Sequence, residues 1–253
     1  MFYGKGQYMK ILLNENERID NLELNNLKII QNTDGFCFGI DSVLLSDFAK
    51  NIKKDANVID FGTGTGIIPI LLSAKSKARH FCAIEIQKDV AEMAQRSVVL
   101  NNLQEKIKVI NGNIKDLMNV SEVYDTVVTN PPYMKLDTGL QNENEKKLIS
   151  RHEITANLED FIKVSSKMLK DNGALYMVHR PERIADIIES LRKNKLEPKI
   201  IRMVYSNVNS KPCMILIKAV KNAKEFLKIE NNLYIYDENG NYTEEILKIY
   251  NKI

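Results

Sequence analysis

The chain has 253 residues, 44% of them hydrophobic and 27% charged, so it can bury a sizeable core and is not disordered throughout. Its 36 Lys and Arg residues against 33 Asp and Glu residues give a formal net charge of +3, which excludes coating of nucleic acid by bulk charge. Three scattered Cys and three scattered His residues argue against disulfides and metal sites, and without a long apolar run or a signal peptide we expect a cytoplasmic protein.

Strand and helix patterns alternate along most of the chain, after a polar lead-in at 1–26. Short apolar runs bounded by turn residues predict seven strands, at 56–61, 81–86, 107–110, 125–129, 174–179, 199–205 and 213–220. Apolar positions at helical spacing predict helices at 41–50, 67–74, 88–102, 157–170, 181–194 and 243–251. Asp41 is predicted to cap the first helix, and the mostly polar segment 134–150 to be a loop, with a short helix as the alternative.

This alternation predicts an α/β fold with a mostly parallel seven-stranded sheet covered by helices on both faces. The last two strands are close enough in sequence to form an antiparallel pair. We expect one domain over 1–253, with an N-terminal segment at 27–55, a Rossmann-like core at 56–220, and a hairpin and helix at 221–253.

A glycine turn follows the first predicted strand. Gly62, Gly64 and Gly66 stand at every second position behind Asp60, which differs from the Gly-x-Gly-x-x-Gly pattern of dinucleotide-binding proteins. Such a turn lets the backbone lie flat against an uncharged sugar and an amino-acid tail, although by itself it is also a common structural turn. About 20 residues further on, Glu85 lies at the end of the second predicted strand, where its carboxylate can accept hydrogen bonds from ribose hydroxyls.

The tetrapeptide Asn130-Pro131-Pro132-Tyr133 follows the fourth predicted strand. Together with the glycine turn and Glu85, it makes the chain resemble class I S-adenosylmethionine-dependent methyltransferases that modify an amino group on a planar carbon. More narrowly, the sequence resembles the family that methylates N6 of adenosine 37 in tRNA1(Val), over about 27–250. The residues that carry this likeness are Gly39 to Ala49, Arg151, Lys211-Pro212 and Gly240 to Tyr242.

The resemblance implies S-adenosylmethionine as cofactor and an adenosine in a single-stranded tRNA loop as substrate, with segment 27–55 covering the cofactor. The residues it implies for cofactor binding are Asp41, Asp60, Gly62, Thr63, Gly64, Gly66, Glu85, Ile86, Asn113, Ile114 and Asn130. It implies catalytic roles for residues 130–133 and substrate contacts by Tyr133, Arg151 and Lys211. Asn113 departs from the family pattern, which usually has Asp there, and accepts less strongly from the adenine amine.

The chemistry of the tetrapeptide follows from the target group. A ring or amide NH2 is a poor nucleophile because its lone pair is delocalised. If the side-chain oxygen of Asn130 and the carbonyl of Pro131 each accept one N–H, the lone pair points toward the methyl donor and the developing positive charge meets fixed dipoles. The prolines restrict the backbone, and Tyr133 offers a ring on which a base can stack.

Other functions share parts of this pattern. A release-factor glutamine N5-methyltransferase uses the same tetrapeptide on a side-chain amide, but places a longer helical domain where this chain has only segment 1–55. A methyltransferase acting on amino groups of rRNA or DNA remains open, as does a cofactor-binding protein without catalysis, such as an RNA chaperone. The sequence does not predict the oligomeric state.

Overall fold

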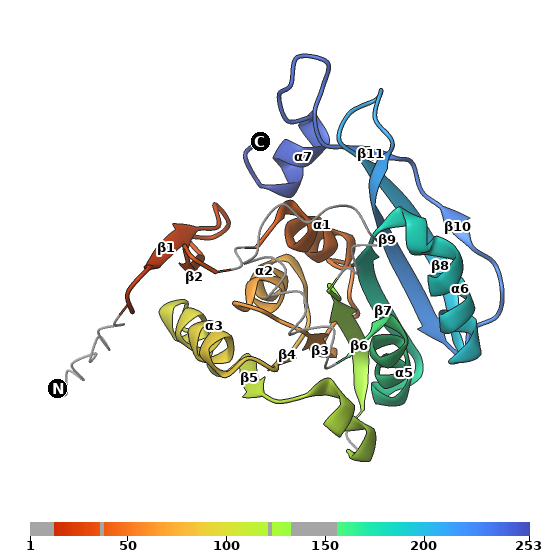
Figure 1. The fold of residues 1–253 in the computed structure, drawn as a ribbon, viewed down its shortest axis with the longest axis horizontal. Coiled ribbons are helices and arrows are strands. Elements are labelled where there is room, and N and C mark those ends of the chain that lie inside the picture. Colours follow the sequence, from red (N-terminus) through yellow and green to blue (C-terminus); the bar gives the residue numbers. More distant parts are fainter. Residues whose placement is uncertain (1–12, 36–37, 121–122, 133–155) are drawn as a thin grey trace.

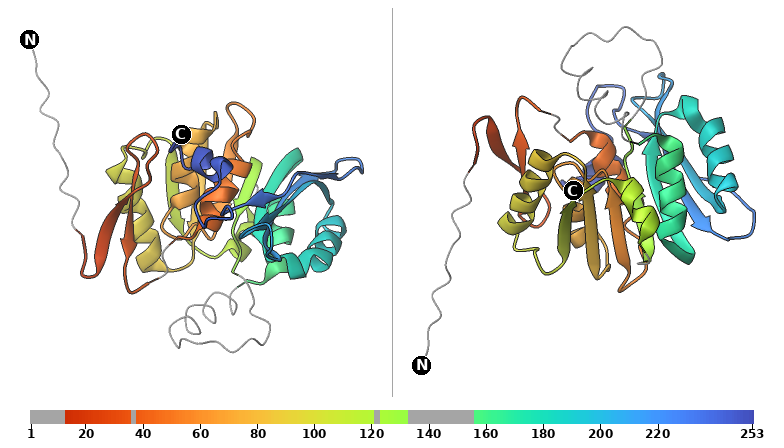
Figure 2. Two further views of the ribbon diagram at one scale, coloured as in Figure 1. Left: turned by 90° about the horizontal axis from the view of Figure 1, so that it is seen from above. Right: turned by 60° about the horizontal axis from the view of Figure 1, so that its bottom comes forward.

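The computed structural model describes residues 13–35, 38–120, 123–132 and 156–253. Its centre is a nine-stranded sheet between two layers of helices (Figures 1 and 2). The strands lie in the order β10-β8-β9-β7-β6-β3-β4-β5, with β11 also paired to β8. Seven of them were predicted: β3 (Asn57–Phe61), β4 (His80–Glu85), β5 (Ile107–Asn111), β6 (Tyr124–Thr129), β7 (Leu169–His179), β8 (Leu196–Tyr205) and β9 (Pro212–Lys221).

The direction of the strands confirms the predicted α/β class. Strands β5, β4, β3, β6 and β7 are parallel neighbours, whereas β9 runs antiparallel to both β7 and β8. Two short strands, β10 (Lys228–Ile229) and β11 (Leu233–Tyr234), extend the edge by pairing in parallel with β8. The hairpin expected before the last helix is therefore reduced to a single antiparallel bridge between Tyr236 and Tyr242.

Two hydrophobic cores separate the helices into layers. One core contains apolar side chains of α1 (Ile40–Phe48), α2 (Ile67–Lys75), α3 (Lys88–Leu100) and α7 (Glu244–Ile249). The other contains side chains of η1 (Ile114–Asn119), α5 (Leu158–Met168) and α6 (Ile184–Lys193), the last preceded by the turn η2 (Pro181–Arg183). Successive strand residues point to opposite faces, so Val58 of β3 enters the first core and Ile59 the second. Within the described ranges, no helix has the length and apolarity needed to cross a membrane.

An N-terminal hairpin was not predicted from the polar lead-in. Strand β1 (Glu17–Asn21) pairs antiparallel with β2 (Lys28–Asn32), and the hairpin packs beside α3 (Figure 1). Arg96 of α3 donates to both carboxylate oxygens of Glu17 at 2.6 Å, which lowers the pKa of Glu17 through this hydrogen-bonded pair. An ion pair thus joins β1 to α3, while apolar residues of the turn and of β2, among them Leu27 and Ile29, pack into the first core. The sequence of β1 itself is largely polar, so no apolar periodicity could have revealed that strand.

The first residues of α1 and α5 and a glycine in β7 each have a specific local role. Helix α1 begins after Gly39, so Asp41 lies in its first turn and is not the cap that the sequence predicted. Helix α5 begins with a reciprocal capping box, in which Asn157 accepts from the Asp160 N–H and Asp160 accepts from the Asn157 N–H, both at 3.0 Å. Gly173 at the start of the β6–β7 pairing is required by space, because an added Cβ would lie 2.8 Å from the carbonyl oxygen of Lys170.

Candidate active site at the carboxyl edge of the sheet

The carboxyl ends of the parallel strands bring the predicted site residues to one edge. Along that edge, residues at or just beyond the ends of β5, β4, β3 and β6 follow one another in the order of the strands. These are Asn113, Glu85, the glycine turn and Asn130 respectively. Ligand sites of open α/β sheets lie at this edge, where loops and helix starts replace regular backbone pairing.

The glycine turn adopts the conformation that its sequence requires. Gly62, Gly64 and Gly66 have φ values of 68°, 57° and 87°, in the left-handed region that favours glycine. The N–H groups of Gly62 and Thr63 both donate to the carbonyl oxygen of Ile84 at 3.0 Å, which anchors the turn to β4. A Cβ added at Gly64 would meet no atom within 4 Å, so the turn borders open space there.

Glu85 is fixed by backbone donors on both carboxylate oxygens. Its side chain is buried, with Oε2 accepting from the Gly64 N–H and Oε1 from the Gln87 N–H, both at 3.0 Å. Asn111, which sequence reasoning missed, donates from Nδ2 to the carbonyl oxygens of Glu85 and Ile86 at 2.9 Å. The carboxylate therefore has a set orientation beside the glycine turn, and each oxygen keeps a lone pair for a further donor.

Asp60 is a buried carboxyl group that the described part of the chain leaves without a hydrogen bond on either oxygen. Burial raises the pKa of Asp60 to about 8; the nearby Thr63 hydroxyl opposes this shift, and the charge of Glu85 adds to it. A cation bound at this edge would favour the ionised form of Asp60. An uncompensated carboxyl group beneath a glycine turn is typical of a site shaped for a ligand.

Asn113 is the N-cap residue of η1. Its Oδ1 accepts from the Lys115 N–H at 3.0 Å, and Ile114 behind it is buried. The amide oxygen has a second lone pair, so it can accept a further hydrogen bond such as the predicted one from an adenine amine.

The side chain of Asn130 is held by hydrogen bonds to residues of helix α1. Its Nδ2 donates to Oδ2 of Asp41 at 2.8 Å and lies 3.5 Å from the hydroxyl oxygen of Ser42. Because a carboxylate can only accept, this bond keeps the nitrogen of the Asn130 amide toward α1 and turns its oxygen the other way. Pro131 is buried behind it, and Pro132 is partly buried.

Of the three residues predicted to contact the substrate, only Lys211 lies within the described residues. Tyr133 and Arg151 lie outside the described residues. Lys211 is exposed in the connection between β8 and β9, at the start of β9. Among the described residues, no group of three His, Cys, Asp or Glu side chains is arranged to hold a metal ion.

Comparisons with known proteins agree with this geometry. The family model called methyltransferase small domain matches residues 38–197, which include the glycine turn, Glu85 and the tetrapeptide. The chain belongs to this methyltransferase family. As a member of it, the protein is an enzyme that transfers a methyl group, and the edge formed by β3 to β6 is where its motif residues meet.

Individual relatives extend the likeness over most of the chain. A tRNA1(Val) (adenine(37)-N6)-methyltransferase of Parabacteroides distasonis is 29% identical over 212 residues, which cover 83% of this chain and 87% of that protein. The protein of the same name from Pedobacter heparinus is 28% identical, covering 81% and 85%. A crystal structure of a predicted O-methyltransferase from Agrobacterium tumefaciens superposes with a TM-score of 0.65 at 20% identity, covering 83% of this chain and 95% of that chain, and shows the shared fold.

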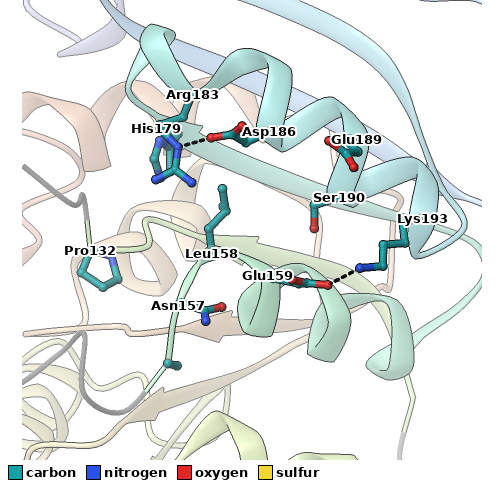
Figure 3. Close-up of a pocket in the computed structure, with 11 residues that line it drawn as sticks. Pro132, Asn157, Leu158, Glu159, His179, Arg183, Asp186, Glu189, Ser190 and Lys193 are labelled. Carbon is teal, nitrogen blue, oxygen red and sulfur yellow. Dashed lines mark hydrogen bonds and ion pairs between the residues drawn. The ribbon is translucent and has the colours of Figure 1, made fainter. Parts of the chain in front are cut away.

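A cavity of about 390 Å³, which was not predicted from the sequence, adjoins Pro132 on the side of β7. Pro132 lines one end, His179 at the end of β7 lines another side, and residues of α5, η2 and α6 complete it (Figure 3). Burial lowers the pKa of His179 to about 4, so this ring is neutral at neutral pH. Residues 130–132 thus lie between the glycine-turn side of the edge and this cavity.

Proposed function

We propose that the enzyme transfers a methyl group from S-adenosylmethionine to the exocyclic N6 amine of an adenosine in tRNA, at position 37 beside the anticodon. The observation that carries this proposal is the amide of Asn130, oriented by Asp41 next to the glycine turn and Glu85. Relatives named for this reaction, similar over more than four fifths of the chain, support the substrate.

The residues on the glycine-turn side fit the cofactor. Glu85 would accept from the ribose hydroxyls, Asn113 and Ile114 would hold the adenine, and Gly62 to Gly66 would leave room for the sugar and the amino-acid tail. Asp60 is buried below the turn with a pKa raised to about 8, so a positively charged ligand bound above it would favour its ionised form and be attracted by that charge. When bound, S-adenosylmethionine supplies an electrophilic methyl group.

The chain's own residues prepare the amine. The oxygen of the Asn130 side chain and the carbonyl of Pro131 would each accept one N–H of the target, which draws the nitrogen lone pair out of conjugation. Asp41 keeps the Asn130 oxygen facing the target because it occupies the amide nitrogen. No strong base is needed, since the methylated nitrogen is acidic enough to lose its proton to water.

The substrate must present its amine unstacked. A base inside a helix cannot reach such an edge, whereas an adenosine in an anticodon loop can be splayed out and stacked on Tyr133. Arg151 and Lys211 would contact phosphates, and binding would then weaken steeply with salt. A tRNA substrate also places the enzyme in the cytoplasm.

The test is transfer of labelled methyl groups from S-adenosylmethionine to three purified substrates: unmodified tRNA, rRNA and a release factor. We expect labelling of tRNA at one adenosine of the anticodon loop, identified as N6-methyladenosine. Labelling of a glutamine in the release factor, or of rRNA alone, would overturn the assignment of substrate while leaving the methyltransferase family intact. Labelling of none would contradict the reaction.

A further inference from the structure

The cavity beside Pro132 is placed to receive part of the substrate. Strand β6 lies between β3 and β7 in the sheet, so residues 130–132 separate the proposed cofactor side from the cavity side of the edge. Asn130 and Pro131, which would bind the target amine, do not line the cavity, whereas the next residue, Pro132, does. A group in the cavity would therefore neighbour the methylated base and would not be that base.

The charges of the lining do not suit a phosphate. Arg183 forms an ion pair with Asp186, and Lys193 lies 2.9 Å from Glu159, so each cation of the lining already faces a carboxylate. Glu189 adds a third carboxylate. A lining with more carboxylates than cations repels a phosphate but can accept hydrogen bonds from N–H groups on a neutral ring.

The shape of the lining suits a flat ring. Figure 3 shows Leu158 pointing from α5 into the cavity, with Arg183 and His179 on the opposite side and Pro132 at one end. The ion pair with Asp186 fixes the guanidinium of Arg183, whose plane is a good stacking surface for a nucleobase. The volume of about 390 Å³ is at the lower end of the range for ligand pockets and exceeds what a single base needs.

We propose that this cavity is a subsite for the nucleobase next to the methylated adenosine, held as a flat ring between Arg183 and Leu158. The inference rests on the proposed function. The carboxylates at the rim favour a base with an exocyclic amine, namely adenine, guanine or cytosine, over uracil. The subsite would add affinity for the RNA and would help to fix which adenosine reaches Asn130.

The test combines a change in the enzyme with a change in the RNA. Arg183→Lys keeps the positive charge and removes the planar stacking surface. Arg192→Lys is the matched control, because Arg192 lies near the end of α6, the helix that begins directly after Arg183, also pairs with a carboxylate, that of Glu197, and does not line the cavity. The RNA is an anticodon stem-loop with its natural sequence, with uracil, or with an abasic nucleotide on either side of the target.

We expect Arg183→Lys to raise the KM for the natural stem-loop about tenfold with little change in kcat, as loss of one stacked base would. An abasic or uracil nucleotide on one side of the target should raise the KM of the wild type and of Arg192→Lys by a similar factor, but add nothing in Arg183→Lys. Leu158→Ala should repeat the Arg183→Lys result, and thermal unfolding of each variant checks that it is folded.

Two outcomes would overturn the subsite. The first is a wild-type KM in both cavity variants, and the second is an abasic effect of equal size in Arg183→Lys and the wild type. Both presuppose that the wild type methylates the stem-loop, so they leave the proposed function standing. Absence of methyl transfer to any RNA by the wild type would contradict the proposed function and the subsite together.

Discussion

The side chains of Asn130 and Asp41 meet at 2.8 Å although they are 89 residues apart in the chain. One follows the central strand β6, and the other lies in the first turn of α1 on one face of the sheet. This hydrogen bond decides which end of the Asn130 amide faces a substrate, because a carboxylate accepts only from the nitrogen. Asp41 is thus a positioning residue for the proposed reaction.

Removing that carboxylate should slow methyl transfer. We expect Asp41→Ala to lower kcat by roughly ten- to a hundred-fold, because the Asn130 amide loses its orientation. Asp41→Asn should stay within about tenfold of the wild type, since its amide oxygen can still accept from Asn130, less strongly than a carboxylate. The measurement is kcat at saturating S-adenosylmethionine, which separates this role from a contribution to cofactor binding. Wild-type kcat in Asp41→Ala would show that the hydrogen bond is not needed.

Glu85 should affect cofactor affinity and not the chemical step. In Glu85→Gln only one oxygen remains to accept, and the NH2 group would face the N–H of either Gly64 or Gln87. We expect the KM for S-adenosylmethionine to rise about tenfold or more, as for loss of a charged hydrogen bond, with kcat at saturation nearly unchanged. Glu105→Gln, the same change at an exposed position before β5, is the control. A fall in kcat with unchanged KM would contradict this role.

The raised pKa of Asp60 predicts a dependence of stability on pH. Its carboxyl has a pKa of about 8 in the folded chain against 3.8 when exposed, so the folded state holds a proton that the unfolded state releases. Stability of the cofactor-free protein should therefore fall as pH rises from about 4 to about 8, by up to about 1.4 kcal/mol per pH unit from this group.

The measurement is urea unfolding of the wild type and Asp60→Asn at about pH 6 and about pH 8. The change in the free energy of unfolding between the two pH values is then compared between the two proteins. The variant should lose less stability over that interval, and its comparison with the wild type removes contributions from other groups. One of these is His179, whose pKa is lowered by burial to about 4 from 6.5 and which destabilises the fold as pH falls. Equal pH dependence in both proteins would mean that Asp60 is ionised in the fold.

The sequence predicted the sheet, and the glycine turn and Glu85 at its edge, because those features are local. Buried strands appear as apolar runs, and three left-handed backbone positions required glycines at 62, 64 and 66. Glu85 was found because it is a carboxylate at the end of an apolar strand. These signals depend on neighbours in the chain, and tertiary contacts did not alter them.

The rest depends on contacts between distant segments. The link from Asp41 to Asn130 joins residues from two distant segments. The cavity beside Pro132 is lined by residues that follow β6, end β7, begin α5 and run along α6. Strand β1 escaped prediction because its sequence is largely polar, and it is held by backbone pairing with β2 and by the ion pair of Glu17 with Arg96. The short strands β10 and β11 pair with β8 through backbone hydrogen bonds, which no side-chain pattern encodes.

The most direct test of the account is the nucleoside content of tRNA in cells. Mass spectrometry should find N6-methyladenosine in tRNA from the parent strain and none at that position in a strain lacking the gene. A gene copy with the wild-type sequence should restore it, whereas Asn130→Ala should not, because that variant is expected to lose about 10²-fold or more in kcat. Unchanged N6-methyladenosine in the deletion strain, or full restoration by Asn130→Ala, would contradict the central claim.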